Sequence, residues 1–220
     1  MDNGKINKRM MTLAIETSSP QASLCLAEDD TILFCADWTA ERNHDAYLFP
    51  ALQHAMDALG ERQLDWILVG SGPGSYGGVR VALAAAVGIS TVKEARTVTL
   101  CSWEYLAHGE ACIVSDARRG GWTLRQPDGA ISVITPEELR ELAADTGILL
   151  YTTECAERMK QESLCATKYS LIPTAEGLIH TWNALSKEEQ EKRASLPAEP
   201  IYVRPPHITE AKRKPWEIRD

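Results

Sequence analysis

Glu16 ends the first apolar run of the sequence, and a turn rich in hydroxyl groups, residues 17–21, follows it. An acid at a strand end can help to hold a metal–nucleotide complex, because a hard cation prefers oxygen ligands. Hydroxyl groups in the following turn can then lie near the phosphates. Glu16 and Thr17 are therefore candidate nucleotide contacts, although the residues alone favour a simpler interpretation, an acid that caps the turn.

A glycine-rich segment, SGPGSYGG at residues 71–78, precedes the next predicted helix. Its glycines allow backbone conformations closed to other residues, and the first amides of the helix could bind an anion. The segment lacks the P-loop lysine and is interpreted as neither a P-loop nor a dinucleotide-binding fingerprint, so a tight strand-to-helix turn is favoured over a phosphate cradle. The candidate anion contacts here are Gly72, Gly74 and Ser75.

The histidines do not form the pair that metal sites on a helix require. His44 and His54 are ten residues apart, so they cannot reach one metal from adjacent turns. The sequence also lacks a G-x-S-x-G elbow and a nucleophile with an evident base. We therefore expect no metal site and no catalytic centre, and we interpret His44 as a helix-start or interface residue.

Composition narrows the class of protein. Hydrophobic residues make up 44% and charged residues 25% of the 220 residues, as is usual for a globular protein. The net charge of -8 disfavours a protein that binds nucleic acid by itself, and the basic run at residues 212–214 is interpreted as a solvated tail rather than a nucleic-acid contact. No apolar run reaches the roughly 18 residues of a membrane span. The six cysteines lack C-x-x-C spacing and predict a cytoplasmic protein whose cysteines are mostly small buried hydrophobes.

The elements that would position these residues form two groups. In the first half we predict strands at 11–16, 23–28, 32–38, 64–70 and 97–100, and helices at 43–59, 79–94 and 102–109. In the second half we predict strands at 111–116, 122–126, 130–134 and 147–152, and helices from 136 and at 154–162 and 174–185. Thr135 and Glu138 have capping-box spacing around Pro136. The expected divisions are an extension (1–10), a first lobe (11–109), a second lobe (110–207) and a tail (208–220).

The first two long helices are unusually apolar. The apolar arc of the first is wider than the ~100° stripe that packs on one core. In the second, Arg80 is the only charged residue between Val79 and Ile89, and small residues keep its surface thin. We expect another subunit to cover them, the alternative being the second lobe. The candidate interface residues are His44, Leu48, Leu52, Ala55, Met56, Val79, Arg80, Leu83, Ala86 and Val87.

Five blocks, in order, resemble the TsaB/YeaZ family: MTLAIETSS, RNHDAYLFPAL, VGSGPGSYGGVRVALAAAVGIS, IVSDARRGGW and EPIYVRPP. The resemblance implies an α/β fold of the actin/Hsp70-like superfamily, with two ribonuclease-H-like lobes that contain mixed sheets and flanking helices. Two positions depart from the family: Glu16 replaces a usual Asp, and Gly77 replaces a usual Thr. Both departures weaken the hypothesis that this chain binds nucleotide by itself.

The resemblance also implies a supporting function. In this family the paralogous TsaD subunit transfers a threonylcarbamoyl group to N6 of adenosine 37 in tRNA, and it carries the paired histidines. TsaB is a non-catalytic subunit that binds TsaD through its first two helices, and the ATPase TsaE joins the assembly. The implied partners are therefore TsaD, TsaE, tRNA only through the complex, and a second copy in isolation. The resemblance implies no cofactor for the isolated chain, and ATP or ADP could be bound only within the complex.

Three alternative functions follow from other features. A phosphotransferase of the same superfamily would use Glu16 and the glycine-rich segment on a nucleotide. A metalloprotease-like glycoprotease is disfavoured by the missing histidine pair, and a direct tRNA-binding module is disfavoured by the net charge.

Overall fold

The computed structural model describes residues 9–40, 43–107, 111–145, 147–153, 155–164, 166 and 170–204. Most of the expected extension and the whole expected tail, with the basic run at 212–214, lie outside these residues. None of the helices in the described ranges is long and apolar enough to cross a membrane.

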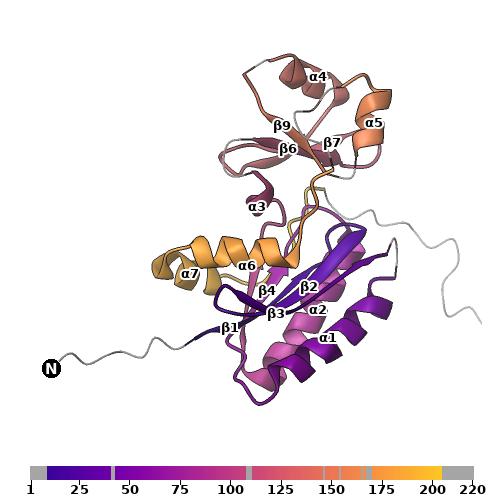
Figure 1. Cartoon of the computed structure of the whole chain (residues 1–220). Coiled ribbons are helices and arrows are strands. Elements are labelled where there is room, and N and C mark those ends of the chain that lie inside the picture. Colours follow the sequence, from indigo (N-terminus) through magenta and orange to yellow (C-terminus); the bar gives the residue numbers. More distant parts are fainter. Residues whose placement is uncertain are drawn as a thin grey trace, which may run out of the picture.

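The first sheet has five strands in the order β3-β2-β1-β4-β5 (Figure 1). The strands are β1 (Met11–Glu16), β2 (Gln21–Glu28), β3 (Thr31–Thr39), β4 (Trp66–Gly70) and β5 (Arg96–Leu100). The first three form an antiparallel meander, while β4 pairs in parallel with both β1 and β5. β1 and β4 are buried along their whole length because helices cover both faces of the sheet. The predicted succession of strands and helices in this half is confirmed.

Helices α1 (Asp45–Leu59) and α2 (Tyr76–Lys93) pack on one face of the first sheet. α2 begins three residues earlier than predicted, because the Ser75 side chain accepts a hydrogen bond from the Gly78 amide and caps the helix. Pro50 lies inside α1, which begins before it. The short helix α3 (Glu104–Ala107) follows β5.

The second sheet has four strands in the order β8-β7-β6-β9. They are β6 (Cys112–Asp116), β7 (Trp122–Arg125), β8 (Ile131–Ile134) and β9 (Leu150–Thr152). β6 pairs in parallel with β9, and the other pairs are antiparallel. Helices α4 (Pro136–Ala144) and α5 (Ala156–Gln161) flank this sheet, and α4 carries the predicted capping box between Thr135 and Glu138.

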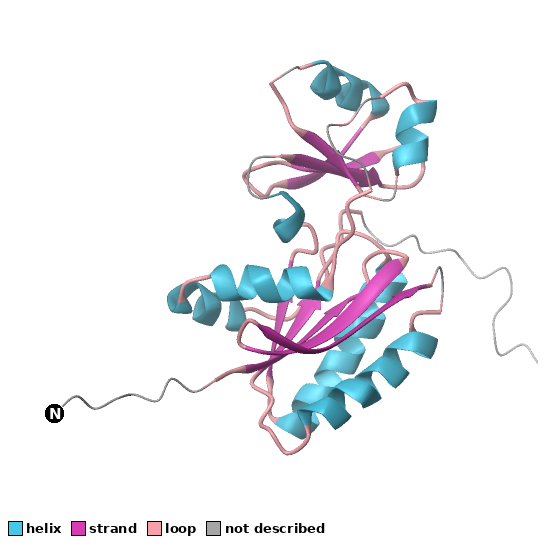
Figure 2. Cartoon of the chain, in the orientation of Figure 1, coloured by secondary structure: helices cyan, strands magenta, loops and turns pink. Residues whose placement is uncertain are grey.

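The last two helices return to the first sheet, as Figure 2 shows. α6 (Ala175–Ala184) lies on the face opposite α1 and α2, where Leu178, Ile179 and Trp182 join the core. α7 (Lys187–Ala194) contacts β5, and Arg96 pairs with Glu191. The sequence analysis placed residues 110–207 in one lobe, whereas α6 and α7 pack against the first sheet. We therefore call the first sheet with α1, α2, α6 and α7 the first lobe, and the second sheet with α4 and α5 the second lobe.

Two features differ from the sequence interpretation. α7 was not predicted, because it has no buried residue and therefore no apolar periodicity. Its S-x-x-E cap, between Ser186 and Glu189, was the available signal. The six cysteines were interpreted as mostly small buried hydrophobes, yet strand register places Cys25 and Cys35 opposite each other across β2 and β3, where they form a disulfide.

Candidate functional site

The structure corrects half of the predicted interface. Ten residues were named, and five of their side chains are buried within the chain itself instead of facing a partner. These five are Leu48, Leu52 and Ala55 of α1 and Val79 and Ala86 of α2. Four of them join one core cluster with Leu13, Ile15 and Ile67 of the sheet, because the apolar face of that sheet requires cover. Met56 and Leu83 are half-buried against the same cluster.

The opposite side of α2 is open. Val87 is 52% exposed and Val92 is 78% exposed, and no atom lies within 4 Å of a Cβ built on Gly88. The exposed residues recur at helical spacing, so they share one face. We define the outer face of α2 as Arg80, Ala84, Val87, Gly88 and Thr91.

Aromatic side chains of α1 and α2 are also exposed. Phe49 of α1 is 57% exposed, and Tyr47 is 50% exposed. Arg80 lies over the ring of Tyr76, 5.1 Å from its centroid. The second lobe lies beyond one end of the first sheet and does not cover these helices (Figure 1). The alternative in which the second lobe covers both helices is therefore wrong.

The predicted anion contacts are not brought together on one surface. Glu16 and Thr17 are fully buried. The Ser18 amide donates to Glu16 Oε1 at 2.7 Å, and Thr17 Oγ1 donates to the Gly78 carbonyl at 2.9 Å. Burial raises the pKa of the Glu16 carboxyl, and interactions with Ser18 and Ser102 offset part of that rise. Glu16 is enclosed beneath the glycine-rich segment rather than presented to a ligand.

The remaining predicted contacts have mainly backbone roles. Gly74 packs on Ser18, since an added Cβ would lie 2.1 Å from the Ser18 carbonyl oxygen. Gly72 has a φ of +85° and donates its amide hydrogen to Ser102 Oγ at 3.0 Å. Ser75 caps α2. Gly74 and Ser75 also line a cleft, which Glu16, Thr17 and Gly72 do not.

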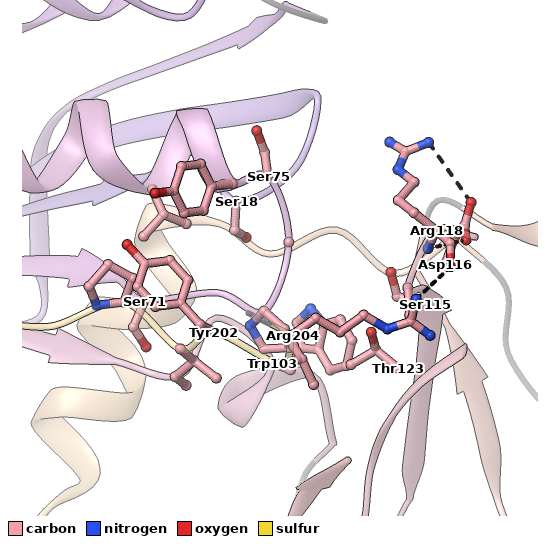
Figure 3. A pocket seen from close by; sticks show the side chains of 18 of the residues that line it. Ser18, Ser71, Ser75, Trp103, Ser115, Asp116, Arg118, Thr123, Tyr202 and Arg204 are labelled. Carbon is pink, nitrogen blue, oxygen red and sulfur yellow. Dashed lines mark hydrogen bonds and ion pairs between the residues drawn. The ribbon is translucent and has the colours of Figure 1, made fainter. Parts of the chain in front are cut away.

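This cleft lies between the two lobes and has a volume of about 420 Å³ (Figure 3). The first lobe contributes Ser18, Ser75 and Tyr76, and the second lobe contributes Asp116 and the Arg118 loop. The lining also contains Ser71, Trp103, Ser115, Thr123 and residues 200–204. The sequence analysis did not identify it, because its walls come from several segments that are separated in the chain.

His44 precedes the first residue of α1 and also lines the cleft. It is 5% exposed, lines the cleft, and has no hydrogen-bond partner for Nδ1 among the described residues. Burial lowers the pKa of its imidazole, and the neighbouring Asp45 carboxylate partly opposes that effect. His44 is therefore a cleft residue at the helix start rather than part of the outer face of α2.

The segment at residues 200–204 closes one side of the cleft and contacts both lobes. The Ile201 amide donates to the Ser71 carbonyl at 2.8 Å in the first lobe, and the ring of Tyr202 lies 5.2 Å from that of Tyr76. In the second lobe, Arg204 Nη1 donates to the Arg118 carbonyl at 3.2 Å. The sequence blocks around Arg118 and Arg204 meet here, although nothing in their separate patterns indicated it.

The described residues contain no group of three or more His, Cys, Asp or Glu side chains that could hold a metal ion.

Comparisons with known proteins agree with one another. The sequence model of the TsaD family, described as tRNA N6-adenosine threonylcarbamoyltransferase, matches residues 38–126. The tRNA threonylcarbamoyladenosine biosynthesis protein TsaB of Bacillus subtilis (strain 168) is 30% identical over 119 residues, which cover 50% of this chain and 52% of that protein. The match therefore spans about half the length of this relative.

Two solved structures share the fold. An uncharacterized protein from Pseudomonas aeruginosa with similarity to peptidase YEAZ has a TM-score of 0.68 and 21% identity, over 89% of this chain and 100% of that chain. YeaZ from Pseudomonas aeruginosa has a TM-score of 0.65 and 20% identity, over 88% of this chain and 99% of that chain. The expected fold class, with two lobes built on mixed sheets, is confirmed.

Proposed function

Because the chain belongs to the TsaB/YeaZ family, we propose that it is a non-catalytic subunit in tRNA threonylcarbamoyladenosine biosynthesis. It binds a TsaD-type catalytic subunit through the outer face of α2 and the exposed aromatic residues of α1. TsaE and ATP or ADP join only within that complex, and tRNA is contacted through it. In isolation the chain pairs with a second copy through the same surface, in the cytoplasm.

One observation carries this proposal: within the described part of the chain, α2 is covered on one side only. Its inner side completes the core through Ala82 and Ala86, while its outer face contains the small or apolar residues Ala84, Val87 and Gly88. Small side chains let a second helix approach closely. Tyr47 and Arg80 are of the types enriched among binding hot spots, and Phe49 is of a type enriched at interfaces. The surface is therefore suited to a helix of another subunit.

The enclosed Glu16 supports a non-catalytic role. A carboxyl that coordinates a metal–nucleotide complex must present its oxygens to the ligand. Glu16 has no exposed surface, and a Cβ on Gly70 would lie 2.0 Å from its Oε2. A phosphotransferase would need Glu16 to face the nucleotide, so the burial of Glu16 disfavours that alternative.

The test compares Val87→Arg with Leu196→Arg. Val87 lies on the outer face of α2 and is 52% exposed, whereas Leu196 lies after α7 and is 61% exposed. Both changes replace an exposed apolar side chain with arginine, so only the location differs. Each variant is co-purified with the cognate TsaD-type protein, and its self-association is measured by analytical ultracentrifugation.

We expect Val87→Arg to weaken binding by about tenfold or more, because it inserts a charge into a desolvated helix contact, and we expect Leu196→Arg to bind normally. In a tRNA modification assay, we expect modification only when the wild-type chain is present. The proposal is wrong if Val87→Arg binds as wild type, or if omission of the chain leaves modification unchanged.

A further inference from the structure

Cys25 and Cys35 form a pair whose two members differ sharply in accessibility. Cys25 of β2 is 1% exposed and belongs to the core beneath α6, with Leu178 and Ile179. Cys35 of β3 is exposed, and it is the only exposed cysteine among those that the structure describes. Solvent and small molecules can therefore reach one member of the pair, while the other is covered.

The position of β3 explains this difference. β3 is the edge strand of the first sheet and pairs with β2, whereas α6 packs on β1, β2 and β4. Strand register places Cys25 and Cys35 directly opposite each other, with their Cα atoms 4.2 Å apart. Side chains approach most closely at such positions of an antiparallel pair. The two sulfur atoms can therefore bond without a rearrangement of either strand.

The fold also holds β3 in place by means other than this bond. β3 pairs with β2 from Thr31 to Thr39. On the other face of the sheet, Phe34 and Trp38 pack against the core cluster that includes α1. We therefore expect the reduced chain to keep both strands, with the two thiols adjacent and ready to bond again.

We propose that Cys25 and Cys35 form a reversible redox site that exchanges with a small disulfide. An accessible cysteine next to a resolving cysteine, which attacks the first adduct, is the arrangement of redox-sensing pairs. Exposed disulfides are also reduced more readily than structural ones. In the cytoplasm, where the chain is proposed to act, disulfides are usually of this transient kind. The chemistry itself involves only the first sheet, so it does not depend on the binding of a TsaD-type subunit.

The exchange has two steps, and Cys35 reacts first because it is accessible. The Cys35 thiolate attacks one sulfur of the small disulfide, whose own sulfur–sulfur bond breaks and releases one thiol. The Cys25 thiolate then attacks the sulfur of Cys35, expels the second thiol and closes the intramolecular bond. The protein loses two protons and two electrons, and the small disulfide gains them to become two thiols. Reduction follows the same steps in reverse.

Oxidation joins the edge strand covalently to the strand beside it. β3 supports α1, since the ring centroid of Phe34 lies 6.3 Å from that of His54. The bond also closes a loop between cysteines ten residues apart, which restricts the unfolded chain. The oxidised chain should therefore unfold at a higher urea concentration than the reduced chain.

Glutathione is the probe, at ratios of its reduced and oxidised forms that run from fully reducing to fully oxidising. The full chain is equilibrated at about pH 8, near the pKa of a free thiol. Remaining thiols are alkylated in denaturant, and peptide mass mapping then gives the state of each cysteine. Cys25→Ala and Cys35→Ala each remove one member of the pair. Cys101→Ala is the control, because Cys101 is a free cysteine outside the pair.

We expect Cys25 and Cys35 to lose their thiols together across the series, without bound glutathione, in the wild type and in Cys101→Ala. Cys25→Ala should retain glutathione on Cys35, because the resolving thiol is missing. Cys35→Ala should carry about tenfold less glutathione on Cys25, because Cys25 is covered.

Two results of the glutathione series would overturn the proposal. In one, the pair stays reduced at every ratio, so that no bond forms. In the other, the pair stays oxidised in an excess of reduced glutathione, as a permanent structural disulfide does. Equal urea midpoints for the oxidised and reduced chains would also contradict the expected fixing of the edge strand.

Discussion

Ala84 and Ala86 lie two residues apart on α2 but in opposite environments. Ala86 has no exposed surface and belongs to the core cluster between α1, α2 and the first sheet. Ala84 is exposed on the outer face of α2. Arginine at each position therefore tests separately whether the inner side of α2 stabilises the fold and whether the outer face binds a partner.

The two substitutions should differ by several kcal/mol in folding free energy. Ala86→Arg places a guanidinium group in an apolar core without a carboxylate, which costs about 3–5 kcal/mol or more. That loss is comparable to the ~5–15 kcal/mol that stabilises a typical domain. Ala84→Arg leaves the side chain in solvent and should change stability by about 0.5 kcal/mol or less. It should instead weaken partner binding by about 2 kcal/mol, which is roughly 30-fold.

Urea unfolding followed by circular dichroism measures the first effect, and calorimetric titration with the TsaD-type subunit measures the second. Ala86→Arg should unfold at a much lower urea concentration, whereas Ala84→Arg should match the wild type in urea and bind roughly 30-fold more weakly. A fully stable Ala86→Arg protein would refute the burial of the inner side. A stable Ala84→Arg protein with unchanged affinity would refute the outer face as the binding surface.

Two further predictions concern stability. Burial raises the pKa of Glu16 above 4.5, so the contribution of its protonated form to folding stability is complete below pH 4.5 and is lost as pH rises through the folded-state pKa. The stability of Glu16→Gln relative to wild type should therefore increase with pH in urea titrations from about pH 4.5 upward. A difference that stays constant with pH would contradict this prediction. Arg158 lies 4.0 Å from the Trp122 ring centroid and bonds Asp116 and the Gly121 carbonyl. Arg158→Ala should destabilise the chain by about 2 kcal/mol in urea unfolding, and an unchanged midpoint would show that these contacts are not stabilising.

Local signals in the sequence were sufficient for most elements. The alternating and continuous apolar runs predicted the strands of the first sheet, and the Thr135 capping box predicted α4. α7 was missed because salt-bridged polar residues leave no apolar period to detect. The disulfide was missed because only the register of β2 against β3 brings Cys25 opposite Cys35.

The sequence by itself determined that α1 and α2 carry more apolar surface than one sheet can cover, since composition and periodicity are local properties of each helix. Only the tertiary structure decided which side of each helix is covered: Leu48, Ala55 and Ala86 turn inward, and Val87 turns outward. The cleft was beyond sequence reasoning for the same physical reason. Its walls combine side chains from distant segments, and whether Glu16 or Arg204 faces a ligand depends on how the lobes and the segment at 200–204 pack together.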